Sequence, residues 1–261
     1  MSIWEAIWIA IVEGLTEYLP VSSTGHIIIT EWLLGIAPTD FTKLFTVAVQ
    51  SGAIMAVLVL YWQRFVKSWD FYIRLLVAFI PTAILGLMAN SLIEKLLENV
   101  LSIAVMLVAG GIVLLFLDKW FEKASSEVNI EDLSYPQLAT IGLFQSLAMF
   151  PGVSRSAASI VGGLVGGLNR AKATEFSFFL GVPTIGAATL KELYEKKDIL
   201  TPENIKILGV GSIVGYFVAI LAIQFFIDYI SKNGFKVFGW YRIAVGTALL
   251  IAWAAGANLQ L

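Results

Sequence analysis

Long apolar stretches alternate with short polar breaks along most of this chain. Six of these stretches are close to twenty residues long, and a helix needs roughly 20 mostly apolar residues to cross the hydrocarbon core of a bilayer. Each stretch therefore predicts a membrane-spanning helix, and the long polar segment 119–136 predicts a connection in the middle of the chain. The predicted spans are about 43–62, 70–91, 100–118, 172–191, 205–229 and 239–256.

Two further apolar segments are broken in the middle by proline, glycine and serine. The first, 3–34, is interrupted at 19–26, and the second, 137–167, is interrupted at 150–156. The apolar runs beside each break are too short to span a bilayer and are typical of re-entrant segments. Irregular backbone at membrane depth persists only where protein or a wet cavity satisfies its polar groups. We therefore predict two re-entrant helical hairpins whose tips line a cavity.

The two broken segments also resemble each other. Residues 13–25 align with residues 145–157 without a gap, at an offset of 145 − 13 = 132. Chance similarity is the alternative in so apolar a chain, and the shared position of the breaks favours duplication. The sequence thus predicts a first repeat at 1–120 and a second at 133–258, each with one hairpin and three spans. The identical pairs are Leu15 and Leu147, Val21 and Val153, and Ser22 and Ser154; later landmarks at roughly this offset are Phe45 and Phe176, and Asn99 and Asn233.

The number of crossings determines how the two halves are related. A re-entrant hairpin returns to its own side, so the three spans that follow leave the chain on the opposite side and the second half starts inverted. Inverted repeats place a site near the membrane midplane, where broken helices meet. The predicted fold is an all-α polytopic membrane protein with six transmembrane helices, two re-entrant hairpins and an inverted-topology repeat.

Lysine and arginine are distributed unequally between the two predicted sides. Ten lie on the side opposite the termini and six on the side of the termini. Because basic residues accumulate in cytoplasmic loops, we predict that both termini and the site face the outside. The ten are Arg64, Lys67, Arg74, Lys119, Lys123, Arg170, Lys172, Lys232, Lys236 and Arg242, and the six are Lys43, Lys95, Lys191, Lys196, Lys197 and Lys206.

Composition agrees with a membrane protein and excludes some function classes. Hydrophobic residues make up 58% of the 261 residues and charged residues only 14%, whereas soluble domains are about a quarter charged. The net charge of −2 argues against a nucleic-acid partner, because phosphate backbones select basic patches. The absence of cysteine excludes disulfides, thiol catalysis and cysteine metal sites. Acidic residues interrupt the first apolar run and no basic region precedes it, so no cleavable signal is expected.

Two glutamates lie in the first half of the first hairpin. Glu13 and Glu17 are four residues apart, so they share one face of a helix. Carboxylates within a membrane segment are costly and mark functional sites. Paired carboxylate oxygens suit Mg²⁺ or Ca²⁺, with substrate phosphates completing the coordination, and they also suit acid–base work. The alternative is a helix end at the membrane interface with both carboxylates in water.

The first break carries a run of hydroxyl groups followed by the only histidine of the chain. Ser22, Ser23 and Thr24 precede the second half-helix, where a hydroxyl caps the helix and where the helix N-terminus also binds anions. A serine that acts as a nucleophile needs an adjacent base, and capping alone is the alternative. For His26, the candidate roles are general acid or base, orientation of a nucleophile and binding of a phosphate oxygen, with a structural role as the alternative.

The second break carries an arginine at its tip. Arg155 lies between Ser154 and Ser156, just after a Pro-Gly pair. An arginine at mid-membrane depth needs an anion, and its planar guanidinium binds phosphate bidentately. The alternative is a buried ion pair with Glu13 or Glu17. Taken together, the two breaks indicate phosphoryl transfer on a diphosphate.

These two segments resemble those of a known family. The stretch from Glu13 to His26 and the stretch from Pro151 to Ser156 closely resemble the two signature segments of bacterial undecaprenyl-diphosphate phosphatases of the bacitracin-resistance type. Residues 174–178 are similar to a third family segment, and the resemblance covers essentially the whole chain. One departure is Ala157, where the family often has glycine.

The resemblance implies hydrolysis of undecaprenyl diphosphate to the monophosphate carrier and inorganic phosphate in the bacterial plasma membrane. This reaction recycles the carrier for cell-wall synthesis and gives bacitracin resistance. The resemblance also implies dependence on a divalent metal, Mg²⁺ or Ca²⁺. It implies catalytic roles for Glu17, His26 and Arg155, supported by Glu13, Ser22, Ser23, Thr24, Ser154 and Ser156.

Several alternatives stay open at this point. Either a serine or water attacks phosphorus, and Ser23 is favoured over Ser22, because Ser22 has the identical partner Ser154 and shares a capping task with it. A transporter or flippase of polyprenyl phosphates or other anions is the competing class, since inverted repeats and broken helices are typical of secondary transporters. A structural scaffold would have no use for the buried charges. The expected partners are the bilayer and a polyprenyl diphosphate, and the oligomeric state, a homodimer included, is open.

Overall fold

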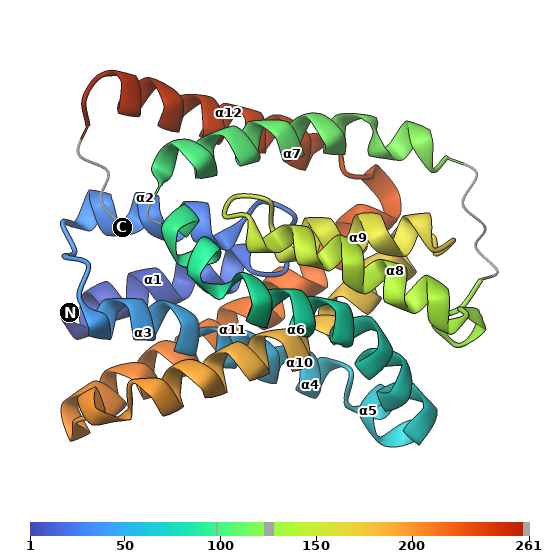
Figure 1. The fold of residues 1–261 in the computed structure, drawn as a ribbon, viewed down its shortest axis with the longest axis horizontal. Coiled ribbons are helices and arrows are strands. Elements are labelled where there is room, and N and C mark those ends of the chain that lie inside the picture. Colours follow the sequence, from blue (N-terminus) through green and yellow to red (C-terminus); the bar gives the residue numbers. More distant parts are fainter. Residues whose placement is uncertain (98, 123–127, 258–261) are drawn as a thin grey trace.

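The protein is a bundle of helices, and a computed structural model describes residues 1–97, 99–122 and 128–257, with side chains described outside 90–97. Within these ranges all regular secondary structure is helical (Figure 1). The helices are α1 (Ile3–Thr16), α2 (Ser23–Leu34), α3 (Asp40–Ala48), α4 (Gln50–Leu60), α5 (Trp62–Lys67), α6 (Trp69–Leu97), α7 (Val100–Trp120), α8 (Tyr135–Ser146), α9 (Arg155–Val165), α10 (Arg170–Glu195), α11 (Pro202–Asn233) and α12 (Lys236–Ala254), with 3₁₀ turns η1 (Ile130–Asp132), η2 (Leu147–Met149) and η3 (Lys197–Ile199).

Five helical stretches in the described residues are long and apolar enough to cross a membrane. They coincide with five of the six predicted spans; the first joins α3 and α4 across Val49. The sixth predicted span, 172–191, forms α10, which is 26 residues long but less apolar than the others and is not among the five. The hydroxyls of Ser177 and Thr184 on α10 bond to Ser159 and Gln145, so some of its polar side chains serve contacts inside the protein. The five are Asp40–Leu60, Trp69–Ala89, Val100–Trp120, Pro202–Asn233 and Lys236–Ala254.

Both broken segments form helices separated by a short non-helical break. In the first, α1 and α2 are separated by residues 17–22; in the second, α8 and η2 are separated from α9 by residues 150–154. Each break ends in a serine with a positive φ, 72° at Ser22 and 76° at Ser154, and these are the only such non-glycine residues in the described chain. The two helices that begin at these breaks therefore start from matching backbone geometry.

Helices of the two halves pack against each other in an exchanged pattern. The first arm of each hairpin packs on the second long helix of the other half, α1 on α11 and α8 on α6. The corresponding pairs α4 with α10 and α7 with α12 also pack together (Figure 1). The two hairpins are thus held side by side in the interior rather than within separate lobes.

An aromatic core fixes the first break. Tyr18 is fully buried, its hydroxyl donates to the carbonyl of Ala53 at 3.0 Å, and its ring meets Phe178 edge-on at 5.0 Å between centroids. Phe178 in turn packs against Phe226 of α11. Since Tyr18 directly follows Glu17, this packing limits the freedom of that carboxylate.

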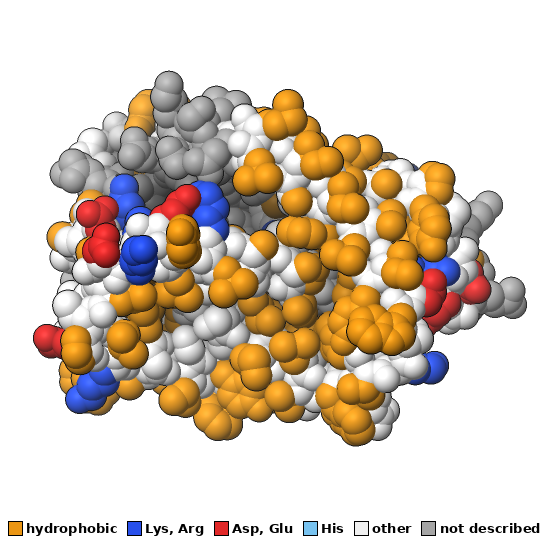
Figure 2. All heavy atoms as spheres, turned by 60° about the horizontal axis from the view of Figure 1, so that its bottom comes forward, with side chains coloured by type: hydrophobic (Ala, Val, Ile, Leu, Met, Phe, Trp, Pro, Cys, Tyr) orange, Lys and Arg blue, Asp and Glu red, His pale blue; other side chains and the backbone are white. Residues whose placement is uncertain are grey.

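The surface is apolar along the middle of the molecule and charged toward its ends. Figure 2 shows hydrophobic side chains across the centre of one face, with lysine, arginine, aspartate and glutamate toward the two ends. At one end Arg64 pairs with Glu131 and Arg170 with Asp118, both at 2.8 Å. Such a pattern fits an apolar belt in contact with lipid and two polar ends in contact with water.

One basic residue does not lie where the sequence count places it. Arg242 is 0% exposed and lies in the interior, so it is no part of a charged membrane surface. Without it, the predicted count of basic residues opposite the termini is 10 − 1 = 9 against six. More basic residues are therefore still predicted on the side opposite the termini than on the side of the termini.

Candidate active site

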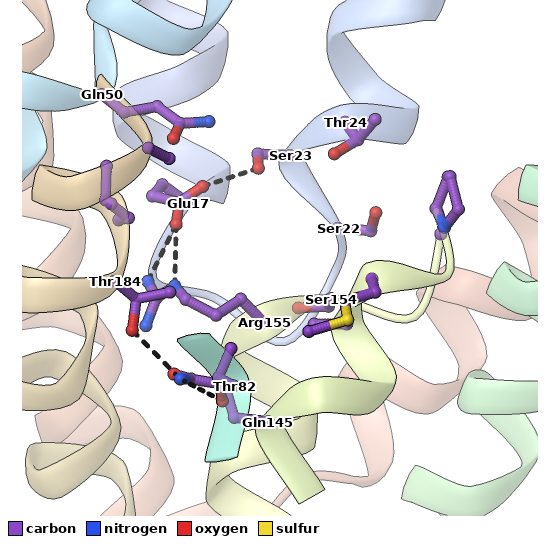
Figure 3. A pocket seen from close by; sticks show the side chains of 16 residues that line it. Glu17, Ser22, Ser23, Thr24, Gln50, Thr82, Gln145, Ser154, Arg155 and Thr184 are labelled. Carbon is purple, nitrogen blue, oxygen red and sulfur yellow. Dashed lines mark hydrogen bonds and ion pairs between the residues drawn. The ribbon is translucent and has the colours of Figure 1, made fainter. Parts of the chain in front are cut away.

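A cavity of about 270 Å³ lies between the two hairpin tips. Most of the residues predicted from the sequence line it together with polar residues from four other helices (Figure 3). The predicted residues in its lining are Glu17, Ser22, Ser23, Thr24, Ser154 and Arg155, and the additional polar ones are Gln50, Thr82, Gln145 and Thr184.

An ion pair joins the two hairpins across this cavity. Arg155 donates from Nη2 and Nε to Glu17 Oε1 at 2.8 and 3.1 Å. The two side chains are only 11% and 6% exposed. The ion pair that the sequence leaves open as an alternative for Arg155 is therefore present, with Glu17 as the partner, while Arg155 also lines the cavity.

The surroundings of Arg155 hold its guanidinium in one place. Nη1 donates to the backbone carbonyl of Ser177 at 3.0 Å, and the guanidinium carbon lies 5.3 Å from the centre of the Tyr18 ring. A methyl group on Gly181 would come within 2.8 Å of Nη1, so a glycine is needed there for α10 to approach. The arginine is thus pre-positioned, which lowers the cost of binding an anion.

Glu17 also accepts a hydrogen bond from a hydroxyl in the first break. Ser23 Oγ donates to Glu17 Oε2 at 2.7 Å, and Figure 3 shows Glu17 between Ser23 and Arg155. A hydroxyl within hydrogen-bonding reach of a carboxylate has the arrangement of a nucleophile and its base. Arg155 holds the same carboxylate through its other oxygen.

The other hydroxyls of the two tips differ in their tasks. Ser154 caps α9, accepting from the amide of Ala157 at 3.2 Å, whereas Ser22 makes no capping bond to α2. Both line the cavity, as does Thr24. Two helix N-termini therefore begin at the same cavity, and helix N-termini attract anions.

Ser156 is placed away from the cavity lining. It is fully buried, and its hydroxyl donates to the backbone carbonyl of Tyr18 at 2.7 Å. That bond links the start of α9 to the first break. In this position Ser156 holds one hairpin on the other.

His26 also lies outside the cavity lining, and both of its ring nitrogens are engaged. Nδ1 lies 2.8 Å from the backbone carbonyl of Ser22, and Nε2 lies 2.7 Å from the hydroxyl of Tyr241 on α12. A carbonyl only accepts, so Nδ1 carries the hydrogen and Nε2 accepts from the tyrosine. His26 thus braces the backbone at Ser22, directly beside Ser23.

Glu13 is buried directly behind Glu17. Its carboxylate is 0% exposed, neither oxygen has a hydrogen-bond partner, and its close neighbours are Glu17 and Gln50. A buried carboxylate needs either a proton or a cation beside it. The unused oxygens of Glu13, beside the carboxylate of Glu17, fit Mg²⁺ or Ca²⁺, which prefer oxygen ligands.

The described residues contain no group of three or more histidine, aspartate or glutamate side chains arranged to hold a metal ion. A cation at Glu13 and Glu17 would therefore complete its coordination with water and substrate phosphate. Mg²⁺ is often bound in this way, through one or two carboxylates.

Sequence reasoning missed a polar cluster in the lining of the cavity, beside Arg155 in Figure 3. Gln145 donates from Nε2 to the hydroxyls of Thr82 and Thr184, both at 3.0 Å. Its carbonyl oxygen is buried without a partner. The only signal was the alignment of Gln145 with Glu13, since the threonines lie in segments that otherwise read as plain spans.

A second cavity adjoins the first. It has a volume of about 520 Å³ and shares Thr24 and Gln50 with the cavity between the tips. Charged residues from α2, α3 and the end of α10 line it, namely Glu31, Asp40, Lys43, Glu192, Glu195 and Lys196. A polar passage thus leads from the tips toward the charged end of the molecule.

Comparison with known proteins gives a family match over nearly the whole chain. A protein-family model described as "Bacitracin resistance protein BacA" matches residues 6–248. This range runs from residue 6 in α1 to residue 248 in α12 and includes both breaks and all the helices between these two positions.

Curated relatives share one printed name. A protein of Flavobacterium psychrophilum named undecaprenyl-diphosphatase is 54% identical over 254 residues, which cover 96% of each chain. Undecaprenyl-diphosphatases of Bdellovibrio bacteriovorus and Aquifex aeolicus are 48% identical over 100% of both chains, and 41% identical over 94% of this chain and 96% of the relative. The similarity is therefore not confined to a single motif or one half of the chain.

Proposed function

The chain belongs to the bacitracin resistance protein BacA family, and from this membership and the cavity geometry we propose that it is an undecaprenyl-diphosphatase. In this role it hydrolyses undecaprenyl diphosphate to undecaprenyl phosphate and inorganic phosphate in the bacterial plasma membrane. Recycling of the lipid carrier supports cell-wall synthesis and gives bacitracin resistance. The observation that carries the proposal is the chain of contacts Ser23–Glu17–Arg155 at a cavity where two helices begin.

The terminal phosphate of the substrate would lie in the cavity at the N-termini of α2 and α9. Arg155 and the helix ends place positive charge where the phosphoryl oxygens carry negative charge, and this stabilises the transition state. The polyprenyl chain would extend from the cavity into the lipid. The apolar surface of the molecule supports that placement.

In the first step, Ser23 Oγ forms a bond to the terminal phosphorus as the bond to the bridging oxygen breaks. Glu17 takes the proton of Ser23, and undecaprenyl phosphate leaves. Glu17 becomes neutral on protonation, so its attraction for Arg155 falls and the guanidinium is released toward the phosphoryl oxygens. The ion pair thereby couples proton transfer to Glu17 with the binding of the phosphoryl oxygens by Arg155.

In the second step, water attacks the phosphorus of the phosphoserine and the bond to Ser23 Oγ breaks. Glu17 returns its proton to Ser23 Oγ, and the protons of the attacking water leave with inorganic phosphate. The competing route uses Glu17 to activate a water that attacks the diphosphate directly. The 2.7 Å bond between Ser23 and Glu17 supports the serine route.

Glu13 and Glu17 are the residues that would hold a divalent cation. When bound, Mg²⁺ or Ca²⁺ supplies positive charge that neutralises phosphate oxygens. Glu13 has the unpartnered oxygens for this task, and Gln50 lies beside it. His26 and Tyr241 would keep the backbone of Ser22 in place.

The larger adjoining cavity provides a route for water to enter and phosphate to leave. Several charged side chains line it, and it shares Thr24 and Gln50 with the site. The lipid product departs by a different path, because its polyprenyl chain stays in the bilayer. Separate exits suit a reaction with one soluble and one lipid product.

Six spans and two re-entrant hairpins complete the proposed topology. At about 1.5 Å per residue, the 26 residues of α10 extend for about 39 Å, enough to cross a bilayer. The exchanged packing of α1 on α11 and of α8 on α6 supports an inverted repeat. Both termini, and with them the charged cavity, would then face the outside.

Release of phosphate by the purified protein in detergent tests this function. Undecaprenyl diphosphate should yield inorganic phosphate, and undecaprenyl phosphate under the same conditions should yield much less. Detergent supports no gradient, so a transporter would release none. The proposal fails if the folded protein releases no phosphate while the Flavobacterium psychrophilum relative, assayed in parallel, does.

A further inference from the structure

Arg242 is a fully buried arginine on α12 that the mechanism above does not use. Among the described residues its side chain has no carboxylate partner, and each of its hydrogen bonds goes to a backbone carbonyl. A guanidinium has five N–H donors, and here all five are used. Nε donates to Leu107 at 3.3 Å, Nη1 to Pro20 at 3.0 Å and Val153 at 2.9 Å, and Nη2 to Met106 at 3.1 Å and Gly152 at 2.7 Å.

Three of these carbonyls belong to the two breaks of the active site. Pro20 lies two residues before Ser22, and Gly152 and Val153 directly precede Ser154. Ser22 and Ser154 are the two residues with positive φ from which α2 and α9 start. A single side chain is therefore bonded to both hairpin tips just before their turns.

The remaining two carbonyls tie the same guanidinium to α7. α7 and α12 pack closely, and Gly110 leaves the space that the guanidinium fills, because a methyl group there would collide with Arg242 Nη2. Gly152 permits a similar approach, since a methyl group on it would come within 2.5 Å of the carbonyl oxygen of Ile103. The two tips are thus fastened to one rigid helix pair.

Arg242 itself does not line the cavity between the tips. It has no donor left for a substrate and no contact with Glu17, Ser23 or Arg155 among its bonds. Any influence on the reaction must therefore pass through the backbone of the two breaks.

We propose that Arg242 is a positioning residue that sets the placement of the Ser23 tip relative to the Arg155 tip. The inference rests on the proposed phosphatase function and names the group that aligns its nucleophile with its anion-binding arginine. Ser23 and Arg155 come from hairpins of different halves, so their alignment is not determined by either hairpin alone. A misplacement of about 1 Å at a reacting centre is enough to cost roughly 100-fold in rate.

Arg242→Lys is the main test, because it retains the positive charge and removes the planar guanidinium with its five N–H donors. Lysine has three donors on a flexible stem, so it cannot reach five carbonyls in three segments. In detergent, kcat for phosphate release should fall about tenfold or more, while KM changes less than kcat. The thermal midpoint of the variant shows whether it is folded.

Arg74→Lys is the matched control. Arg74 also donates to backbone carbonyls, at Leu133 and Ile130, and in addition pairs with Asp70, but it does not line the cavity between the tips. Its replacement should leave kcat near that of the wild type. A similar loss in both variants would show that any arginine-to-carbonyl anchor matters equally, and would overturn the proposal.

A double-mutant cycle separates positioning from general weakening. If Arg242 acts by aligning Arg155, then Arg242→Lys should cost much less in an Arg155→Lys background than in the wild type. Additive losses would contradict positioning and indicate an unrelated destabilisation. A folded Arg242→Lys with wild-type kcat would also overturn it.

Gly110→Ala provides a second variant in case Arg242→Lys does not fold. The added methyl displaces the guanidinium but keeps its charge, and alanine favours a helix. Its kcat should fall, and a wild-type kcat would refute the proposal. A wild-type protein without phosphatase activity would instead refute the proposed function, so the two failures are distinguishable.

Discussion

At the scale of single residues, Glu17 is the centre of the site. One oxygen accepts from Arg155 and the other from Ser23, so the same carboxylate joins the candidate anion-binding group and the candidate nucleophile. Sequence reasoning found all three, because charged and polar groups inside membrane segments are costly and therefore mark functional sites. It offered the ion pair of Arg155 only as an alternative, with either Glu13 or Glu17 as the partner, because Glu17 and Arg155 are 138 positions apart and only the fold selects between the two glutamates.

The role of Ser23 leads to a stereochemical prediction. Two successive in-line displacements retain the configuration at phosphorus, whereas one attack by water inverts it. A substrate with a chiral terminal thiophosphate should therefore react with retention, and Ser23→Ala should lower kcat by about 100-fold or more. Inversion, or a Ser23→Ala protein that keeps most of its rate, would assign the attack to water.

The orphaned carboxylate of Glu13 predicts dependence on a divalent cation. Excess EDTA should abolish phosphate release, and Mg²⁺ or Ca²⁺ should restore it. Glu13→Gln replaces the charged carboxylate by a neutral amide. It should therefore raise the metal concentration needed for half-maximal activity more than it raises KM for the lipid. Undiminished activity in EDTA would assign the pair to proton transfer instead.

At the scale of elements, the two breaks were predictable and their internal bonds were not. Proline, glycine and serine inside apolar segments locate the breaks, because such backbone needs a wet or protein-lined environment. The positive φ values of Ser22 and Ser154 could not be predicted, because serine rarely adopts a positive φ and the residue type does not indicate one. Likewise, the sequence predicts a span at 172–191 in α10, but it does not show that the hydroxyls of Ser177 and Thr184 bond to other side chains inside the protein.

Backbone strain at Ser22 predicts a gain in stability at the expense of activity. Its φ of 72° costs about 1–3 kcal/mol for a residue with a Cβ, more than the roughly 0.5–1 kcal/mol of extra entropy that glycine loses on folding. Ser22→Gly should raise the thermal midpoint by about 2–4 °C. Phosphate release should fall, because the hydroxyl that lines the cavity is lost.

Ser22→Ala is the control for this prediction. It removes the same hydroxyl but keeps the Cβ and its strain, so activity should fall without a rise in midpoint. Equal midpoints for the glycine and alanine variants would show that the turn is not strained.

At the scale of the whole molecule, the exchanged packing of the two halves brings the tips together. α1 on α11 and α8 on α6 are equivalent pairs, and α7 with α12 joins the halves along their last long helices. Offset alignment of two short segments predicts a duplication, and this stays a prediction; the sequence gives no information on which helices meet. The site is therefore a product of both halves.

Arg242 shows most clearly where sequence reasoning stops. Its place near the start of an apolar stretch made it look like one of the basic residues at a membrane surface. Its five acceptors are carbonyls from three segments, one of them 222 positions away. No pattern of residue types reveals a site made of backbone oxygens.

The topology predicts that both termini lie outside the cytoplasm. Nine basic residues against six favour the opposite side as cytoplasmic. A reporter active only outside the cytoplasm should work when fused after Leu261, and one active only inside should work near Ser125; both positions lie outside the described residues. A cytoplasmic signal at Leu261 would reverse the orientation.

The central claim is that Arg155 binds the diphosphate at the meeting point of the two hairpins. The most direct test is the rate of phosphate release in detergent by the wild type, Arg155→Lys and Arg155→Ala, each with its thermal midpoint. Lysine keeps the charge but loses the fork that holds phosphate. We predict that Arg155→Lys is folded and slower by about tenfold or more, and that Arg155→Ala is slower still. Rates near that of the wild type in both folded variants would contradict the account.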